Sequence, residues 1–336
     1  MRALEPERRS QLLAGKLTVL AREHLSLSGE PASFPGGAAL RAENRQGAVL
    51  AEADPARSLG RALAWARQAG VERLHLLVED QAGLLARRAT VFATPPEVWW
   101  VRGRELHPVS PEPWAPGEAP AAEALALGPS LVAAGADLVV EHGVVAGEVL
   151  GLEVARVVID PDDGAHIEAG VGRHDREAFS MLHGDLPTDA ALAAVIGSVR
   201  AARNVDAPDH PLRRLASERW LREVVIARPA LVGAIALERH EGPVARPNVK
   251  EPWPAVALGA GPDGEPIVVV TSIGIDLDLV PFAADARLAA GDAAARLVLV
   301  VPERDGHPVT RALAASLRHP AEVVTVPGDW RTLGSG

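Results

Sequence analysis

The feature that most constrains the fold is a pattern of hydrophobic periodicity that occurs near both ends of the chain. Each end has the predicted order helix, strand, strand, helix, strand, helix, strand. The spacings are similar, with 25 residues from Val49 to Leu74 and 29 residues from Val268 to Leu297. We therefore predict an internal duplication. The alternative is that two unrelated α/β segments look alike, because the lengths of elements and loops fall in narrow ranges.

The periodicity also assigns most of the chain to individual elements. Near the N-terminus it predicts helices at 7–25, 54–70 and 82–93, a strand pair within 38–53, and strands at 73–79 and 97–101. Near the C-terminus it predicts helices at 210–225, 277–291 and 308–317, a hairpin at 255–272, and strands at 296–303 and 322–326. Between them it predicts helices at 121–135 and 188–203, one or two strands over 137–160, and a strand at 165–174.

The domain organisation follows from a proline-rich break. Residues 108–121 contain five prolines, which exclude a helix or a central strand. With a weaker break at 203–211, this predicts an N-terminal α/β domain (1–107), a linker (108–121), an acidic middle module (122–205), a C-terminal α/β domain related to the first (206–330) and a tail (331–336). The predicted fold class is α/β, with mixed sheets flanked by helices.

Charge is unevenly distributed along the chain. The net charge is +3 over residues 1–103, −10 over 104–205 and −3 over 206–336. An acidic middle module disfavours nucleic acid as a partner and suits a hard divalent cation, although a solvated acidic surface is the commoner explanation. The absence of cysteine excludes disulfides and thiolate metal sites. With no signal-peptide pattern and no long apolar run, we expect no membrane partner and a cytoplasmic location.

The candidate site lies within residues 151–179, which hold nine acidic or histidine side chains on two predicted strands and a turn. Glu153 and Glu168 lie on opposing strands of this hairpin, where neighbouring side chains are about 5 Å apart. We predict that they are paired metal carboxylates. The alternative is that they face solvent or pair with Arg156 and Arg173.

A second set of ligands follows the hairpin. His174 and Asp175 offer an imidazole and a carboxylate, which suit a transition metal. The alternative is a structural histidine beside an aspartate that caps a helix. A third acidic cluster, formed by Asp276, Asp278 and Asp285, is expected to supply a cap for the following helix and a partner for an arginine.

The order of helix, three strands, helix and strand resembles the core of the PD-(D/E)xK, or restriction-endonuclease-like, superfamily. The resemblance places Glu153 and Glu168 at the acidic positions of the middle module, with Gly170 where the family has lysine. It implies Mg²⁺ or Mn²⁺ as cofactor and a phosphodiesterase or nuclease-like hydrolase, with Arg173 or His174 supplying the catalytic cation.

The terminal segments resemble the same family in layout only. In the N-terminal segment Glu52 is at the acidic position and Asp54 is at the lysine position. In the C-terminal segment Thr271 and Ile273 are at these two positions. Neither Asp54 nor Ile273 places positive charge beside a phosphate, so both segments are expected to be inactive. This leaves a second hypothesis for the whole chain, a catalytically inactive nuclease-like scaffold that binds or regulates a protein partner or forms a homo-oligomer.

Overall fold

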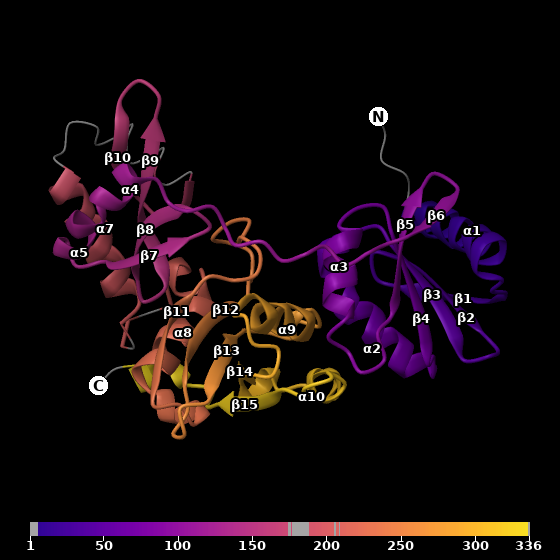
Figure 1. Cartoon of the computed structure of the whole chain (residues 1–336). Helices are drawn as coiled ribbons and strands as arrows, with labels where there is room; N and C mark the ends of the chain where they lie inside the picture. The colour runs from indigo at the N-terminus through magenta and orange to yellow at the C-terminus, as the bar shows by residue number, and fades with distance from the viewer. Residues whose placement is uncertain (1–5, 174–175, 177–187, 205, 208, 335–336) are drawn as a thin grey trace. The chain divides into compact units, whose positions relative to one another are not determined.

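The computed structural model describes residues 6–173, 176, 188–204, 206–207 and 209–334. It contains three sheets flanked by helices, which confirms the predicted α/β class (Figure 1). The chain divides into two compact units. Unit 1 comprises Met1–Trp114, Ile275–Leu288 and His307–Glu322, and unit 2 comprises Ala115–Gly274, Ala289–Gly306 and Val323–Gly336. No helix in the described ranges is both long enough and apolar enough to cross a membrane.

Unit 1 contains a six-stranded sheet in the order β1-β2-β3-β4-β5-β6. Its strands are β1 (Gly29–Phe34), β2 (Gly37–Ala42), β3 (Gln46–Ala51), β4 (Arg73–Val78), β5 (Glu97–Arg102) and β6 (Glu105–Pro108). The pairs β1–β2, β2–β3 and β5–β6 are antiparallel, and β3–β4 and β4–β5 are parallel. The parallel pairs are joined by crossover helices, as parallel strands require.

The helices of unit 1 come from both ends of the sequence. They are α1 (Pro6–Leu25), α2 (Leu59–Ala69), α3 (Ala82–Ala89), α9 (Leu279–Ala289), of which unit 1 takes all but the last residue, and α10 (Pro308–Ala315). Leucines of α1, including Leu17 and Leu20, pack against Leu40, Leu50 and Leu77 of the sheet to form one core. The 3.6-residue spacing of these leucines explains why the first helix could be predicted.

Unit 2 contains a four-stranded sheet in the order β10-β9-β8-β7, in which all neighbouring strands are antiparallel. Its strands are β7 (Asp137–Glu141), β8 (Val144–Val149), β9 (Leu152–Asp160) and β10 (Gly164–Ala169). The accompanying helices are α4 (Ala122–Ala126), α5 (Gly128–Ala133) and α7 (Thr188–Ala202). Leu131, Val154, Leu192 and Val199 lie in the core between these helices and the sheet.

Unit 2 also contains a five-stranded sheet in the order β11-β12-β13-β14-β15. Its strands are β11 (Ala236–His240), β12 (Ala255–Ala260), β13 (Pro266–Thr271), β14 (Arg296–Pro302) and β15 (Glu322–Val326), and helix α8 (Ser217–Ala227) accompanies them. The pairs β11–β12 and β12–β13 are antiparallel, and β13–β14 is parallel. Trp220 and Leu221 of α8 pack with Val269, Val298 and Trp330.

Three expectations from the sequence need correction. The first strand of each terminal sheet, β1 and β11, was not predicted. Residues 137–160 form three strands rather than one or two. The middle sheet is an antiparallel meander of four strands, so the layout helix, three strands, helix, strand does not occur around Glu153. This layout occurs instead in α1-β1-β2-β3-α2-β4. The predicted absence of helix and strand in the proline-rich segment is confirmed for residues 109–121.

Candidate functional site

The β9–β10 hairpin brings the two predicted carboxylates to one arginine. Glu168 on β10 lies opposite Arg156 on β9, and Glu153 lies opposite Glu148 on β8. Arg176 bridges the pair, because its Nη1 donates to Glu153 Oε1 at 2.5 Å and its Nε donates to Glu168 Oε2 at 3.3 Å. Glu153 and Glu168 therefore share one arginine, and the described group that contacts both carboxylates is a guanidinium.

Glu153 is almost completely buried, and its negative charge is compensated by arginines. Arg156 donates two hydrogen bonds to the carboxylate, from Nε at 3.1 Å and from Nη2 at 2.9 Å. Arg246 approaches Glu153 Oε2 at 4.0 Å. A buried carboxylate needs such partners because it has lost the solvation of water. Because arginines already place positive charge on several sides of Glu153, they would repel a divalent cation at this carboxylate.

Glu168 is more exposed than Glu153. His166 Nε2 lies 3.9 Å from its Oε1, so Glu168 has an imidazole as well as Arg176 nearby. Arg173 lines a cavity beside Glu153. His174 and Asp175, the predicted imidazole and carboxylate ligands, lie outside the described residues. No group of three His, Cys, Asp or Glu side chains within the described ranges is arranged to hold a metal ion, and a metal site stays a prediction.

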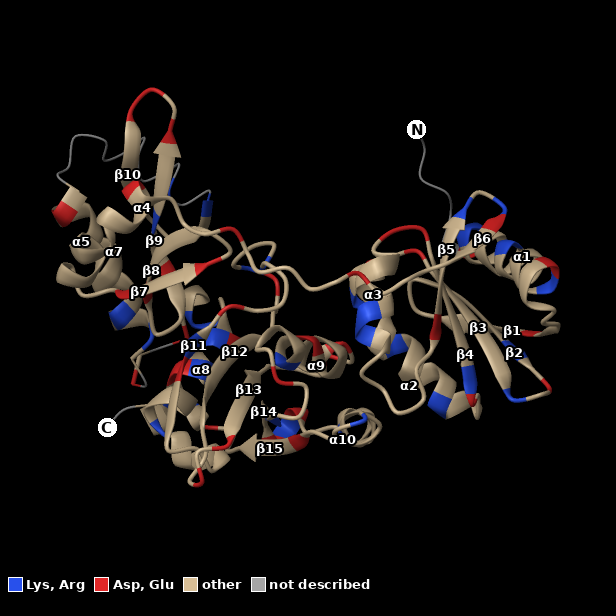
Figure 2. Ribbon diagram, in the orientation of Figure 1, with Lys and Arg blue, Asp and Glu red and all other residues tan. Residues whose placement is uncertain are grey.

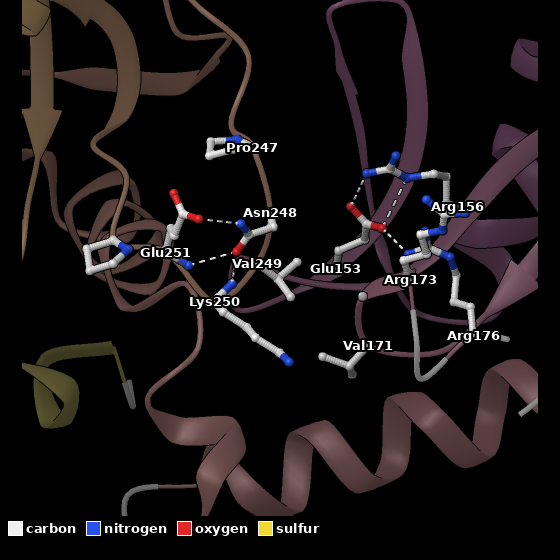
Figure 3. A pocket seen from close by; sticks show the side chains of 12 residues that line it. Glu153, Arg156, Val171, Arg173, Arg176, Pro247, Asn248, Val249, Lys250 and Glu251 are labelled. Carbon is white, nitrogen blue, oxygen red and sulfur yellow. Dashed lines mark hydrogen bonds and ion pairs between the residues drawn. The ribbon is translucent and has the colours of Figure 1, made fainter. Parts of the chain in front are cut away.

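The cavity has a volume of about 880 Å³ and lies between the β9–β10 region and residues 247–252 (Figure 3). Its described lining includes four cationic side chains, from Arg156, Arg173, Arg176 and Lys250. Two carboxylates, Glu153 and Glu251, also line it. The cavity is thus locally basic, in a chain with a net charge of −10.

The other end of the same hairpin is acidic. Asp160, Asp162 and Asp163 cluster at the β9–β10 turn (Figure 2). Asp160 Oδ1 accepts the backbone N–H groups of Asp162 and Asp163 at 2.8 and 3.3 Å, and these bonds lower the pKa of Asp160. The turn of the hairpin is therefore acidic, whereas the opposite end, beside the cavity, is positively charged. A polyanion that approached the turn would be repelled by its negative charge.

A second buried ionic network joins helix α8 to strands β7 and β8 inside unit 2. Arg219 and Arg222 each donate to both Glu141 and Glu148. Burial alone would raise the pKa of Glu148, but the positive charges of Arg219 and Arg222 outweigh it and lower that pKa below its ordinary value. Arg222 also donates to Glu223, which in turn accepts from Arg239. These contacts hold the middle sheet to α8.

The turn between β8 and β9 fits against the same helix. Leu150 and Gly151 both have positive φ, at 49° and 77°. A Cβ at Gly151 would lie 2.6 Å from the backbone carbonyl carbon of Arg219, so glycine allows the turn to approach α8 closely. Arg203 donates to the carbonyl of Leu150 and secures the turn. The turn that precedes Glu153 is therefore packed closely against helix α8.

The third acidic cluster lies in unit 1 and forms ion pairs, as predicted for Asp285. Asp285 is fully buried and accepts from Arg87 Nε at 2.8 Å and Arg88 Nε at 3.1 Å. Arg88 Nη1 also donates to Asp278 Oδ2 at 3.0 Å. Burial raises the pKa of Asp278 to about 7, although Arg88 lowers it in part. Asp276 accepts the backbone N–H of Asp278 at 2.9 Å, just before α9 begins.

The sequence did not indicate the residues that complete the cavity. Arg176 stands between Asp175 and Glu177 in the sequence, where no pattern distinguishes it, and Arg246 and Lys250 lie far along the chain from β9. One signal was available, since Lys250 is one of only two lysines in the chain and stands in the proline-containing segment RPNVKEPWP. No sequence pattern connected that segment to Glu153.

No protein-family model, curated protein or solved structure matches the chain. The class of the protein therefore rests on its own architecture. In its described residues it is a mixed α/β protein with three sheets and a basic cavity beside a buried carboxylate.

Proposed function

We propose that the chain is a ligand-binding protein without hydrolytic activity, whose N-terminal segment α1-β1-β2-β3-α2-β4 has a nuclease-like layout. The observation that carries this proposal is the pairing of the expected metal ligands with arginine. Glu153 accepts from Arg156 and Arg176, and Glu168 accepts from Arg176. Glu153 accepts three hydrogen bonds from guanidinium groups, so it must give up some of them before it can bind a metal through both oxygens. The layout would then serve as a scaffold for binding or regulation.

A metal-dependent phosphodiesterase is the second candidate function. It is favoured by the position of Glu153 and Arg173 on the walls of one cavity. In this function Glu153 and Glu168 hold Mg²⁺ or Mn²⁺, and Arg173 stabilises charge that develops on a phosphate. His174 and Asp175 would complete the set of ligands.

Thermal melting with Mn²⁺ or Mg²⁺ separates the two candidates. For a binding protein we expect the same melting temperature with and without metal at millimolar concentration. A metal that binds only the native state stabilises it by about 2.7 kcal/mol at a hundredfold excess over its dissociation constant. A shift of that kind that disappears in Glu168→Gln, together with metal-dependent cleavage of a phosphodiester, would support the enzyme instead. Glu168 is a suitable position because it is partly exposed, so the substitution preserves the fold.

We also infer that the two terminal sheets arose by internal duplication. Both have two antiparallel pairs followed by a parallel pair, and in both a helix precedes the first strand. A crystal structure in which residues 39–103 and 255–328 superpose as one sheet-and-helix unit would support this inference. Different orientations of the matching strands would contradict it.

A small contact inside unit 1 also supports duplication. Phe92 and Leu317 form an isolated antiparallel bridge. Its hydrogen bonds are reciprocal, because Ala93 donates to the carbonyl of Ser316 at 3.0 Å and Arg318 donates to the carbonyl of Val91 at 2.9 Å. The bridging residues occupy equivalent positions, since each lies five residues before the glutamate that begins the next strand, in β5 and β15. Contact between equivalent residues is typical of a twofold pair.

A further inference from the structure

The cavity beside Glu153 has the size and walls of a small-molecule site. Its volume of about 880 Å³ lies within the range of roughly 300–1,000 Å³ that is common for ligand pockets. Val171 and Val249 line it together with Pro247 and Pro252, which gives it apolar surface as well as charge. The two walls meet closely, since a Cβ at Gly172 would lie 2.8 Å from Val249 Cγ2.

The arginines of the cavity are oriented by Glu153. The carboxylate engages Nε and Nη2 of Arg156, and no other described residue accepts from its Nη1. Arg176 is 7% exposed and is held by Glu153 through Nη1 and by Glu168 through Nε. Guanidinium groups fixed in this way present their remaining N–H donors without further loss of side-chain entropy. Planar donors of this kind match the geometry of phosphate oxygens.

Lys250 brings a further positive charge from the opposite wall. Asn248 Oδ1 accepts the backbone N–H groups of Lys250 at 2.8 Å and Glu251 at 2.9 Å, which fixes a tight turn. Asn248 Nδ2 donates to Glu251 Oε1 at 2.8 Å. In Figure 3 the side chain of Lys250 extends from this turn towards Val171, while Glu251 is directed to Asn248. The turn therefore separates the lysine from the adjacent carboxylate.

We propose that this cavity binds a small phosphorylated ligand whose phosphate groups contact Arg156, Arg176 and Lys250. The proposal rests on the binding function proposed above and names the chemical class of its ligand. The apolar walls at Val171 and Val249 would contact the organic part of the ligand. Nucleic acid is disfavoured as the source of the phosphate, because a net charge of −10 and the acidic turn of the hairpin repel a long polyanion.

Isothermal titration calorimetry on the full chain tests the proposal with three probes, namely ADP, inorganic pyrophosphate and adenosine. We expect ADP to bind most tightly, pyrophosphate to bind more weakly, and adenosine to show no heat of binding. Lys250→Ala should weaken ADP binding by about tenfold, which is typical of the loss of one charged hydrogen bond. Lys16→Ala is the matched control, because Lys16 is the only other lysine and pairs with Glu79 on unit 1, so its removal should leave ADP binding unchanged.

Three results would overturn the proposal. The first is that neither ADP nor pyrophosphate binds at millimolar concentration. The second is that the Lys250→Ala and Lys16→Ala variants lose binding equally. The third is that a single-stranded oligonucleotide binds more tightly than ADP. Failure of the proposed function gives a different result. If ADP binds in a Lys250-dependent manner and is hydrolysed only with Mn²⁺, the ligand class stands and the non-hydrolytic function is wrong.

Discussion

The first five strands of the six-stranded sheet and the five strands of the C-terminal sheet both follow sequence order, but two sets of segments within unit 1 differ in charge. The segments before α2 and within α3 supply Arg57, Arg87 and Arg88, whereas the segment that leads into α9 and α9 itself supply aspartates. The arginines pair with those aspartates, namely Asp276, Asp278 and Asp285. If the segments are duplicates, they have diverged into complementary partners. Like charges at these buried positions would repel each other. The arginines of one segment therefore need the aspartates of the other as partners.

Helices α2 and α9 also differ in the size of the side chain at their second residue. Gly60 is the second residue of α2, and Val280 is the second residue of α9. A Cβ at Gly60 would lie 1.8 Å from the carbonyl oxygen of Leu277, so only glycine allows this approach. The Gly60 N–H also points to Asp278 Oδ1 at 3.4 Å. Close backbone contact and charge pairing therefore occur at the same place.

The largest expected effect comes from breaking the charge complementarity. Arg88→Ala removes a guanidinium that is 2% exposed and leaves the buried Asp285 with fewer partners. We expect a loss of about 3–5 kcal/mol in the stability of unit 1, measured by urea denaturation. Arg67→Ala on the exposed surface of α2 is the control and should change stability by less than about 0.5 kcal/mol. An equally small effect of Arg88→Ala would show that the pairing does not hold unit 1 together.

A smaller effect is expected from breaking the close approach at Gly60. Gly60→Ala forces the backbone at Leu277 to move, and overpacking of this kind costs about 1–3 kcal/mol. Gly15→Ala is a matched control, because Gly15 lies in α1 where a Cβ would meet nothing within 4 Å, and alanine is about 1 kcal/mol better in a helix. The melting temperature should fall for the first variant and rise for the second. A rise for both would argue against contact at Leu277.

The last expected effect is a change in the pH dependence of stability. The folded-state pKa of Asp278 is raised from 3.8 to about 7, chiefly by burial, so the folded state holds a proton that the unfolded state releases. The contribution of this group to stability is therefore fully present below about pH 4 and is lost as the pH rises through about 7. Asp278→Asn should flatten this part of the stability profile, measured by urea denaturation between about pH 4 and 8. An unchanged slope would show that Asp278 is ionised throughout this range.

The sequence predicted the parts of the fold that have strong hydrophobic periodicity. The buried strands β3, β4, β13 and β14 and the helix α1 were found because apolar side chains repeat along them. Strands β1 and β11 were not predicted because both lie at sheet edges and Phe34 is their only buried residue, so their sequences carry little apolar pattern. Strand existence there depends on pairing with a neighbour rather than on local sequence.

The candidate site was predictable only where local pairing determines it. Glu153 and Glu168 lie on the two strands of one hairpin, and the short turn between these strands made that placement predictable. Arg176, which joins them, comes after the hairpin, and Arg246 and Lys250 come from a segment beyond β11. Contacts between residues that are distant in sequence are set by the packing of the whole unit. Sequence alone therefore indicated carboxylates without their guanidinium partners, and metal binding was the natural hypothesis.

The discontinuity of unit 1 has a consequence for how the protein is made. Arg88 and Asp285 are separated by 197 residues along the chain. At a synthesis rate of about 5–20 residues per second, the ribosome adds the aspartate roughly 10–40 s after the arginine. During that interval the nascent N-terminal segment carries Arg87 and Arg88 without their carboxylates. Unit 1 cannot be completed before the residues up to Glu322 have been synthesised, so its first segment spends this interval without its final packing partners.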